Sequence, residues 1–461
     1  MGMEEMAMIH CEQLSFRYAN SSQTLCKIEQ LTIRAGECIV LCGESGSGKS
    51  TFLRLLNGLI PDFYAGEVVG ECRCAGYDVV PTSVETLSTV VGSVFQNPAT
   101  QFFHRRVEDE LVFPCENQGL PRDIIACHLK ETVDFFQIED LLERDLLTAS
   151  GGERQRIAIA TALMQQPKVM VLDEPTANLD EQGIQQVAEQ IARLKAAGVT
   201  VIVAEHRLNF LTELADRYLF FAKGELVHQW THSQYRALSE EERHVLGLRS
   251  AAVSLTCQPL GNSGYGLTLS EVSVGYRTKQ LAYIERVAFP TEQVIGIIGA
   301  NGSGKTTLAK QLAGLQELEG HVTWFGKNFP AQERLRQTAF VMQEVRLQLH
   351  AESVRKEILL GASRLQDFDQ VVAQLNLTDL LDCHPMALSG GQQQRVMIAN
   401  ALLSDKKVFI FDEPTSGLDY KQMRHVAKLL QQLKRSDRVI LVITHDEEFL
   451  NLACDSVWEM K

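Results

Sequence analysis

The sequence predicts an α/β protein built from two tandem copies of one domain, each with a parallel β-sheet core. At 461 residues the chain is too long for a single hydrophobic core. One glycine-rich pattern occurs in each half after a short apolar run, and two later spacings are equal in the halves. We therefore expect a first domain at 7–245, a linker at 246–265 and a second domain at 266–461.

The composition is that of a water-soluble globular protein, with 45% hydrophobic and 22% charged residues. The formal net charge is −14, from 44 Lys and Arg against 58 Asp and Glu. An acidic chain has no general attraction for polyanions, and no local basic patch stands out in the sequence. Nucleic acid is therefore not an expected partner.

No apolar run approaches the roughly 20 residues that a membrane-spanning helix needs, and the start of the chain, with Glu4 and Glu5, does not resemble a signal peptide. We expect a cytoplasmic chain that does not itself span a membrane. The eleven cysteines include close pairs at Cys38/Cys42 and Cys72/Cys74, without a second pair at zinc spacing. Reduced, packed thiols are expected rather than metal ligands.

Each half contains the pattern GxxxxGK[ST] between a predicted strand and a predicted helix, at 43–50 and 299–306. Glycines let successive backbone N–H groups turn toward phosphates, and the following helix N-terminus favours negative charge. Lys49 and Lys305 are expected to reach the β- and γ-phosphates, and Ser50 and Thr306 to offer hydroxyls to Mg²⁺. The expected phosphate-loop contacts are Gly43, Ser45, Gly46, Gly48, Lys49, Ser50 and Thr51, then Gly299, Asn301, Gly302, Gly304, Lys305, Thr306 and Thr307.

An apolar strand ends in two carboxylates in each half, at Asp173-Glu174 and at Asp412-Glu413. A buried strand that ends in charge delivers that charge to a site. We predict that the two aspartates help to hold Mg²⁺, and that Glu174 and Glu413 act as general bases on the attacking water.

A polar turn leads into a helix ahead of each acidic strand, at Ser150-Gly151-Gly152 and Ser389-Gly390-Gly391. Ser150 precedes Glu174 by 24 positions, and Ser389 precedes Glu413 by the same number. His206 and His445 each end a further apolar strand 32 positions after the glutamate. Between the phosphate loop and the acidic strand the halves differ: Lys49 precedes Asp173 by 124 positions, and Lys305 precedes Asp412 by 107.

These motifs together resemble the ATP-binding-cassette (ABC) family over nearly all of both halves. The resemblance implies two P-loop domains, each with an antiparallel β edge (11–18 and 267–276) and a helical subdomain before the signature turn. It also implies that the two halves pair head to tail. One ATP site would join Lys49 and Ser50 to Ser389, Gly390, Gly391 and Gln392; the other would join Lys305 and Thr306 to Ser150, Gly151 and Gly152.

The resemblance assigns further landmarks. Gln96 and Gln343 resemble the Q-loop glutamine that senses Mg²⁺, and His206 and His445 resemble the switch histidine at the γ-phosphate. Tyr18 and Tyr276 lie where the family stacks an aromatic ring on adenine, although either tyrosine can instead belong to the core. Asp180 and Asp419, in Ala-Asn-Leu-Asp and Ser-Gly-Leu-Asp, resemble the D-loop.

The first signature departs from the family pattern. It reads Ala149-Ser-Gly-Gly-Glu153, where the family prefers leucine and glutamine. A carboxylate at Glu153 lies close to the expected triphosphate, where like charges repel and can slow that site. Since Glu413, His445, the phosphate loop and the acidic strand of that site are intact, two competent sites are still favoured.

The stretch after Gln96 indicates a branch of the family. Asn97-Pro98-Ala99-Thr100-Gln101-Phe102-Phe103, followed by 107–113, resembles the ATPase subunits of energy-coupling-factor importers, which take up vitamins and transition-metal ions. The resemblance implies an integral membrane scaffold subunit, a substrate-capturing subunit and a peripheral location on the cytoplasmic face. Pro114 stands where the family usually has glycine. Phe102 and Phe103 are read either as core residues or as part of a coupling groove.

The second half repeats this theme more loosely, with Gln348-Leu349 and 352–358 after Gln343. Tandem ATPases of sugar importers are an alternative but lack the Gln-Asn-Pro-x-x-Gln-Phe-Phe pattern. Soluble tandem-cassette translation factors are an alternative of another class, with a basic arm that binds RNA. Here 222–265 holds four basic and four acidic residues, and Leu255–Gly264 is predicted to be a flexible boundary.

Overall fold

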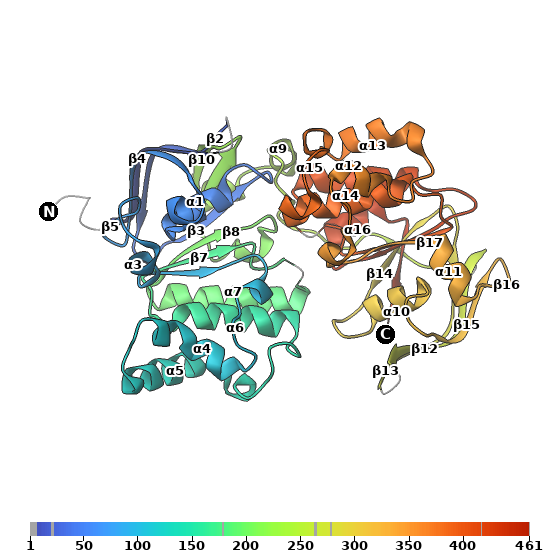
Figure 1. Ribbon diagram of the computed structural model, residues 1–461, viewed down its shortest axis with the longest axis horizontal. Helices are drawn as coiled ribbons and strands as arrows, with labels where there is room; N and C mark the ends of the chain where they lie inside the picture. Colours follow the sequence, from blue (N-terminus) through green and yellow to red (C-terminus); the bar gives the residue numbers. More distant parts are fainter. Residues whose placement is uncertain are drawn as a thin grey trace. The chain divides into compact units, whose positions relative to one another are not determined.

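The computed structural model describes residues 7–19, 23–177, 179–261, 265–276, 279–415 and 417–460. The chain divides into two compact units, residues 1–251 and 252–461 (Figure 1). The division falls inside the expected linker, and we describe each unit by itself. The domain bounds 7–245 and 266–461 remain a prediction.

The described part of the linker is packed rather than loose. Leu248 is buried in a core of the first unit. Strand β11 (Gln258–Pro259) pairs in parallel with β20 (Ser456–Glu459) of the second unit, and Thr256 donates to Asn451 at 2.8 Å. The flexible boundary predicted at 255–264 is therefore an edge strand over part of its length, while residues 262–264 lie outside the described part of the chain.

The first unit has a continuous sheet in the order β5-β4-β1-β2-β10-β9-β3-β8-β7-β6. Its strands are β1 (Ala7–Tyr18), β2 (Thr24–Arg34), β3 (Cys38–Gly43), β4 (Gly66–Cys74), β5 (Tyr77–Asp78), β6 (Val91–Val94), β7 (Val169–Asp173), β8 (Thr200–Ala204), β9 (Arg217–Ala222) and β10 (Glu225–Thr231). Strands β9, β3, β8, β7 and β6 run parallel, and β1, β2, β4 and β5 pair antiparallel. This confirms the predicted parallel core with an antiparallel edge that includes 11–18.

Helices cover both faces of this parallel core (Figure 1). The helices are α1 (Lys49–Leu56), α2 (Leu59–Asp62), α3 (Val84–Ser88), α4 (Val107–Asn117), α5 (Arg122–Phe136), α6 (Gly151–Leu163), α7 (Glu181–Ala196), α8 (His232–Arg236) and α9 (Glu240–Val245). Phe52 of α1 packs with Leu41 of β3 and with the antiparallel strands, whereas Ile157 of α6 and Ile184 of α7 pack on Val40 from the opposite face. Side chains of β3 therefore pack alternately into the cores on the two faces of the sheet. This packing holds β3 in place, and the phosphate loop follows directly from its end.

The second unit has a parallel sheet in the order β11-β20-β14-β19-β18-β17 and a separate antiparallel sheet in the order β13-β12-β15-β16. Its further strands are β12 (Gly266–Tyr276), β13 (Lys279–Pro290), β14 (Val294–Ile298), β15 (Glu319–Trp324), β16 (Lys327–Asn328), β17 (Thr338–Val341), β18 (Val408–Asp412) and β19 (Val439–Ile443). Its helices are α10 (Lys305–Leu312), α11 (Ala331–Gln337), α12 (Val354–Leu359), α13 (Phe368–Gln374), α14 (Gly390–Leu403), α15 (Tyr420–Gln432) and α16 (Glu447–Ala453). The predicted edge at 267–276 lies in β12.

A helical subdomain precedes the signature turn in both units, as predicted. It contains α4 and α5 in the first unit and α12 and α13 in the second. The first is the larger, since α5 has 15 residues and α13 has 7. Helix α4 continues through Pro114, whose carbonyl accepts a hydrogen bond from Gln165 Nε2 at 3.3 Å.

None of the helices in the described ranges combines the length and apolar character that crossing a bilayer requires. The close cysteine pairs lie inside the first unit, where Cys38, Cys42, Cys72 and Cys74 are all buried. Burial raises the pKa of the Cys38 and Cys42 thiols to about 12, so both remain protonated at neutral pH. These thiols behave as small packed side chains.

Candidate functional site

The two phosphate loops have the backbone that a phosphate cradle needs. Gly46 and Gly48 adopt φ of 77° and 107°, and Gly302 and Gly304 adopt 78° and 100°. These left-handed conformations favour glycine. A Cβ added at Gly46 or Gly302 would meet nothing within 4 Å, so these glycines are required by their backbone conformation and not by crowding.

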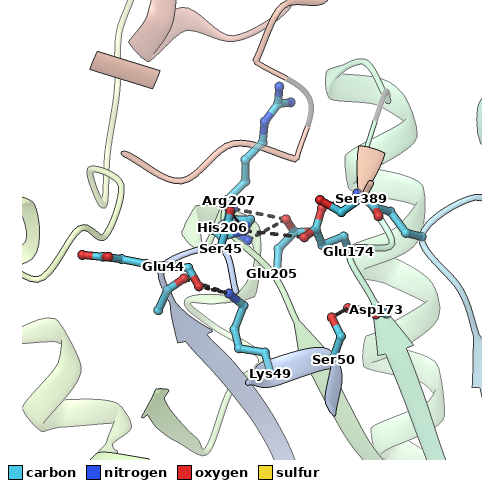
Figure 2. A network of polar contacts seen from close by, with 12 residues as sticks. Glu44, Ser45, Lys49, Ser50, Asp173, Glu174, Glu205, His206, Arg207 and Ser389 are labelled. Atoms are coloured by element: carbon cyan, nitrogen blue, oxygen red, sulfur yellow. Dashed lines mark hydrogen bonds and ion pairs between the residues drawn. The ribbon is translucent and has the colours of Figure 1, made fainter. Parts of the chain in front are cut away.

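The loop lysines are held at the mouth of each cradle. Lys49 Nζ donates to the carbonyl of Gly43 at 2.8 Å and to that of Glu44 at 2.9 Å (Figure 2). Lys305 Nζ makes the equivalent bonds to Gly299 at 2.7 Å and Ala300 at 2.9 Å. Each ammonium group is therefore held at the start of its phosphate loop.

In each unit the residue after the loop lysine donates a hydrogen bond from its hydroxyl to the aspartate that ends the acidic strand. Ser50 Oγ donates to Asp173 Oδ1 at 3.0 Å, and Thr306 Oγ1 donates to Asp412 Oδ2 at 2.8 Å. Burial, with a smaller contribution from Glu174, raises the pKa of Asp173 to about 6, and burial likewise raises that of Asp412. Hard oxygen ligands suit Mg²⁺, and its charge would offset the cost of burying these carboxylates. The residues thus fit the predicted magnesium ion.

Two predicted residues from distant parts of the first unit contact the carboxylate of Glu174. Gln96 Nε2 donates to Glu174 Oε2 at 2.7 Å, and His206 Nε2 lies 3.5 Å from Glu174 Oε1. Ser45 Oγ lies 3.4 Å from the same His206 nitrogen (Figure 2). Burial raises the pKa of Glu174, and the Lys49 charge opposes that shift.

The second unit holds its glutamate differently. Glu413 Oε2 accepts a 2.8 Å hydrogen bond from Thr444 Oγ1, a residue that the sequence analysis did not select. Gln343 is exposed, and His445 is half-buried two positions after the end of β19. Glu174 and Glu413 share a left-handed backbone, with φ of 47° and 49°, which costs free energy in a residue with a Cβ and is concentrated at functional turns.

The signature serines cap the helices that follow them. Ser150 and Ser389 begin α6 and α14 with capping boxes whose partners are Glu153 and Gln392. Ser150 N donates to Glu153 Oε2 at 2.7 Å, and Arg144 Nη1 donates to Glu153 Oε1 at 2.7 Å. Glu153 therefore fills the place that glutamine fills in the second unit, and its charge has a cationic partner within its own unit.

This arrangement predicts a small effect of the unusual glutamate. Changing Glu153 to glutamine should raise ATP turnover by less than about fivefold, because a partly exposed ion pair contributes no more than about 1 kcal/mol. Arg144→Ala should lower turnover in the wild-type background and not in the Glu153→Gln background, since only the carboxylate needs the arginine. Steady-state phosphate release from the four proteins measures this coupling, and equal effects of Arg144→Ala in both backgrounds would contradict it.

The two tyrosines predicted to stack on adenine differ in exposure, and the two D-loop aspartates each cap a helix. The Tyr18 ring packs edge-on against Phe16 with a centroid distance of 4.6 Å, and its hydroxyl lies 3.3 Å from Thr51 Oγ1. Tyr276 is 58% exposed, so a flat ligand can reach its ring. Asp180 and Asp419 cap α7 and α15 through their side chains, while their neighbours Asn178 and Ser416 lie outside the described residues.

The segments after the two Q-loop glutamines are built alike. Gln101 Nε2 donates to the Ser93 carbonyl at 2.9 Å, and Gln348 Nε2 donates to that of Phe340 at 2.8 Å. A buried glutamate then accepts two backbone N–H bonds in each unit: Glu110 from 103 and 104, and Glu357 from 350 and 351. Phe102 is half-buried and packs on the core, whereas Phe103 is 76% exposed.

The fold and these paired sites define a P-loop ATPase with two nucleotide-binding units. A family model described as ABC transporter matches residues 26–177 and 286–416, and the chain belongs to this family as a tandem ABC ATPase. A protein of Treponema denticola named as an ABC transporter ATP-binding protein is 38% identical over 98% of this chain and 94% of its own.

Other similar proteins also span both units. A protein of Sulfurisphaera tokodaii with the same kind of name is 30% identical over 99% of this chain and 96% of its own. Among solved structures, a complex of archaeal ribosomal stalk protein aP1 and the ribosome recycling factor aABCE1 matches with a TM-score of 0.64 and 25% identity, over 96% of this chain and 86% of that one. Tandem ABC ATPases with different partners therefore share this fold.

Proposed function

We propose that this chain is the ATP-hydrolysing motor of a membrane importer of the energy-coupling-factor type, which takes up vitamins or transition-metal ions. The observation that carries the proposal is a groove of about 870 Å³ beside the Q-loop of the first unit. The groove is lined by, among others, Glu85, Gln101, Phe103, Phe113, Pro114 and Leu120.

The wall of this groove carries an exposed aromatic residue whose ring and backbone both make contacts within the unit. The Phe103 and Phe113 rings lie 5.0 Å apart, and Glu110 holds the backbone at Phe103 with a 2.9 Å hydrogen bond. An exposed aromatic side chain at a preformed groove suits an amphipathic helix that inserts apolar side chains. A cytoplasmic helix of an integral scaffold subunit, itself joined to a substrate-capturing subunit, is the proposed occupant.

The proposed ATP sites are composite. Lys49 and Lys305 bind the phosphates of two ATP molecules, and the signature turns at Ser389 and Ser150 close over them from the other unit. Mg²⁺ held through Ser50 and Asp173, and through Thr306 and Asp412, would neutralise phosphate charge. Because the units are fused, their pairing is intramolecular and occurs at high effective concentration.

Within each site the glutamate orients a water molecule and accepts its proton as the water attacks the γ-phosphate. Gln96 and His206 fix the Glu174 carboxylate from two sides. Glu413 has the corresponding role in the second unit, where Thr444 binds its carboxylate and Gln343 and His445 are the residues that match Gln96 and His206. Loss of the γ-phosphate removes the anion that the two units share, so the units separate and pull on the membrane subunit. The chain would then lie on the cytoplasmic face of the membrane as a peripheral subunit.

A soluble role in translation is the rival function, and the similarity to the ribosome recycling factor favours it. Against it stand the neutral composition of 222–265 and the groove beside the Q-loop. A sugar-importer motor is a nearer rival; such ATPases lack the Gln-Asn-Pro-x-x-Gln-Phe-Phe pattern found at 96–103, and the membrane partner would distinguish the two directly.

Affinity capture from detergent-solubilised membranes of the native host tests the proposal. The tagged chain should recover a small polytopic scaffold protein with a substrate-capturing partner, identified by mass spectrometry. Phe103→Asp should lose that recovery at least about tenfold, since it places a charge in an apolar contact. Val69→Asp, at an exposed site on β4 outside the groove lining, is the matched control. Recovery of ribosomes without a membrane protein would move the function to translation.

A further inference from the structure

A carboxylate beside each switch histidine binds a threonine at an equivalent position in the two units, but the carboxylate lies on opposite sides of the histidine. Thr176 and Thr415 each lie two positions after the proposed base. Thr176 Oγ1 donates to Glu205 Oε2 at 2.7 Å, whereas Thr415 Oγ1 donates to Asp446 Oδ2 at 3.0 Å. The carboxylate therefore comes from just before the histidine in the first unit and from just after it in the second.

In the first unit Glu205 joins two loops of the site. Its side chain is buried, and Oε1 accepts hydrogen bonds from His206 N at 2.8 Å and Arg207 N at 3.3 Å. Its other oxygen, Oε2, accepts hydrogen bonds from the hydroxyl and, at 3.3 Å, from the backbone N–H of Thr176; Figure 2 shows Glu205 beside His206 and Arg207. One buried carboxylate thus ties the backbone of His206 to the loop that follows Glu174.

In the second unit the place of Glu205 is taken by Thr444, which is fully buried. Its hydroxyl donates to Glu413 Oε2 at 2.8 Å and accepts from Asp446 N at 3.1 Å. In this unit the carboxylate that binds the threonine is Asp446, after the histidine. The position before the histidine is Thr444, whose hydroxyl binds the proposed base, Glu413.

We propose that Thr444 positions the carboxylate of Glu413 for hydrolysis, and that Glu205 positions His206 beside Glu174, so that the two ATP sites support the same chemistry by different means. This inference rests on the proposed roles of Glu174 and Glu413 as bases. It does not depend on which membrane subunit the chain binds.

The first test removes the Thr444 hydroxyl with little change of shape. Thr444→Val is made in the Glu174→Gln background, so that cleavage depends on Glu413. Hydrolysis of radiolabelled ATP is followed in a single round with protein in excess, and ATP affinity is measured by equilibrium dialysis. Cleavage should fall about tenfold or more, since a hydrogen bond to a charged group is lost, while affinity stays within twofold. Thr444→Ser should restore cleavage.

Reciprocal variants test the asymmetry. In the Glu413→Gln background, Glu205→Gln should slow the cleavage that depends on Glu174. Both carboxylate oxygens of Glu205 accept hydrogen bonds, and glutamine replaces one of them with an NH₂ group, which cannot accept. Each substitution should have its main effect on the base of its own unit. Equal losses in both backgrounds, or equal losses in Thr444→Val and Thr444→Ser, would overturn the proposal. Failure of the bases themselves is distinguishable, because the Glu174→Gln/Glu413→Gln protein would then still cleave ATP.

Discussion

Replacing both Glu174 and Glu413 by glutamine is expected to lower ATP turnover by about 10² or more and to leave nucleotide bound. Both glutamates follow a buried strand and keep a left-handed backbone at φ of 47° and 49°, so the turn places each side chain at the end of the sheet. Glutamine retains the size and one acceptor oxygen of glutamate. It cannot accept a proton from the attacking water, and chemistry is therefore lost while binding is kept.

Phosphate release measures the turnover, and nucleotide retained after gel filtration measures the trapped state. Glu213→Gln is a suitable control, since its side chain is 79% exposed and pairs only with Arg236 in the described ion pairs. If the double variant hydrolysed ATP as fast as the wild-type protein, and the control did too, neither glutamate could be the general base.

Much of the fold was predictable because the motifs themselves dictate local structure. A GxxxxGK[ST] loop requires a strand before it and a helix after it, and the structure places β3 and α1, and β14 and α10, around the two loops. The packed linker was not predictable in the same way. Its strand β11 exists through pairing with β20, about 200 positions later in the chain, and local composition carries no sign of such a partner.

The sequence was enough to select most residues of the candidate sites. It did not predict which of these residues contact one another. Gln96, Glu174 and His206 were selected separately, and the structure brings them to one carboxylate. Arg144 beside Glu153, and Thr444 beside Glu413, were missed because their positions depend on loop conformation. A polar residue between an apolar strand and a histidine was the available signal for both Glu205 and Thr444.

The number of nucleotides bound should fall by one for each phosphate-loop lysine that is removed. Wild-type protein should bind two ATP molecules, Lys49→Ala and Lys305→Ala one each with high affinity, and the double variant none. Each lysine supplies charge-assisted hydrogen bonds to phosphate, which are worth about 1.5–3 kcal/mol apiece, so that two such bonds correspond to an affinity loss of about a hundredfold or more at the altered loop. Isothermal titration calorimetry with a non-hydrolysable ATP analogue gives both stoichiometry and affinity.

The lysines also bond to loop carbonyls, so loss of binding must be separated from loss of structure. Lys27→Ala is a matched control on the same unit, because Lys27 is an exposed lysine that pairs with Glu225 on the surface. The melting temperature of each variant should stay close to that of the control, since the removed Nζ contacts lie in a loop and not in a hydrophobic core. If Lys49→Ala still bound two nucleotides with unchanged affinity, the first loop would not be a phosphate site, and the two halves would share a fold without sharing a function.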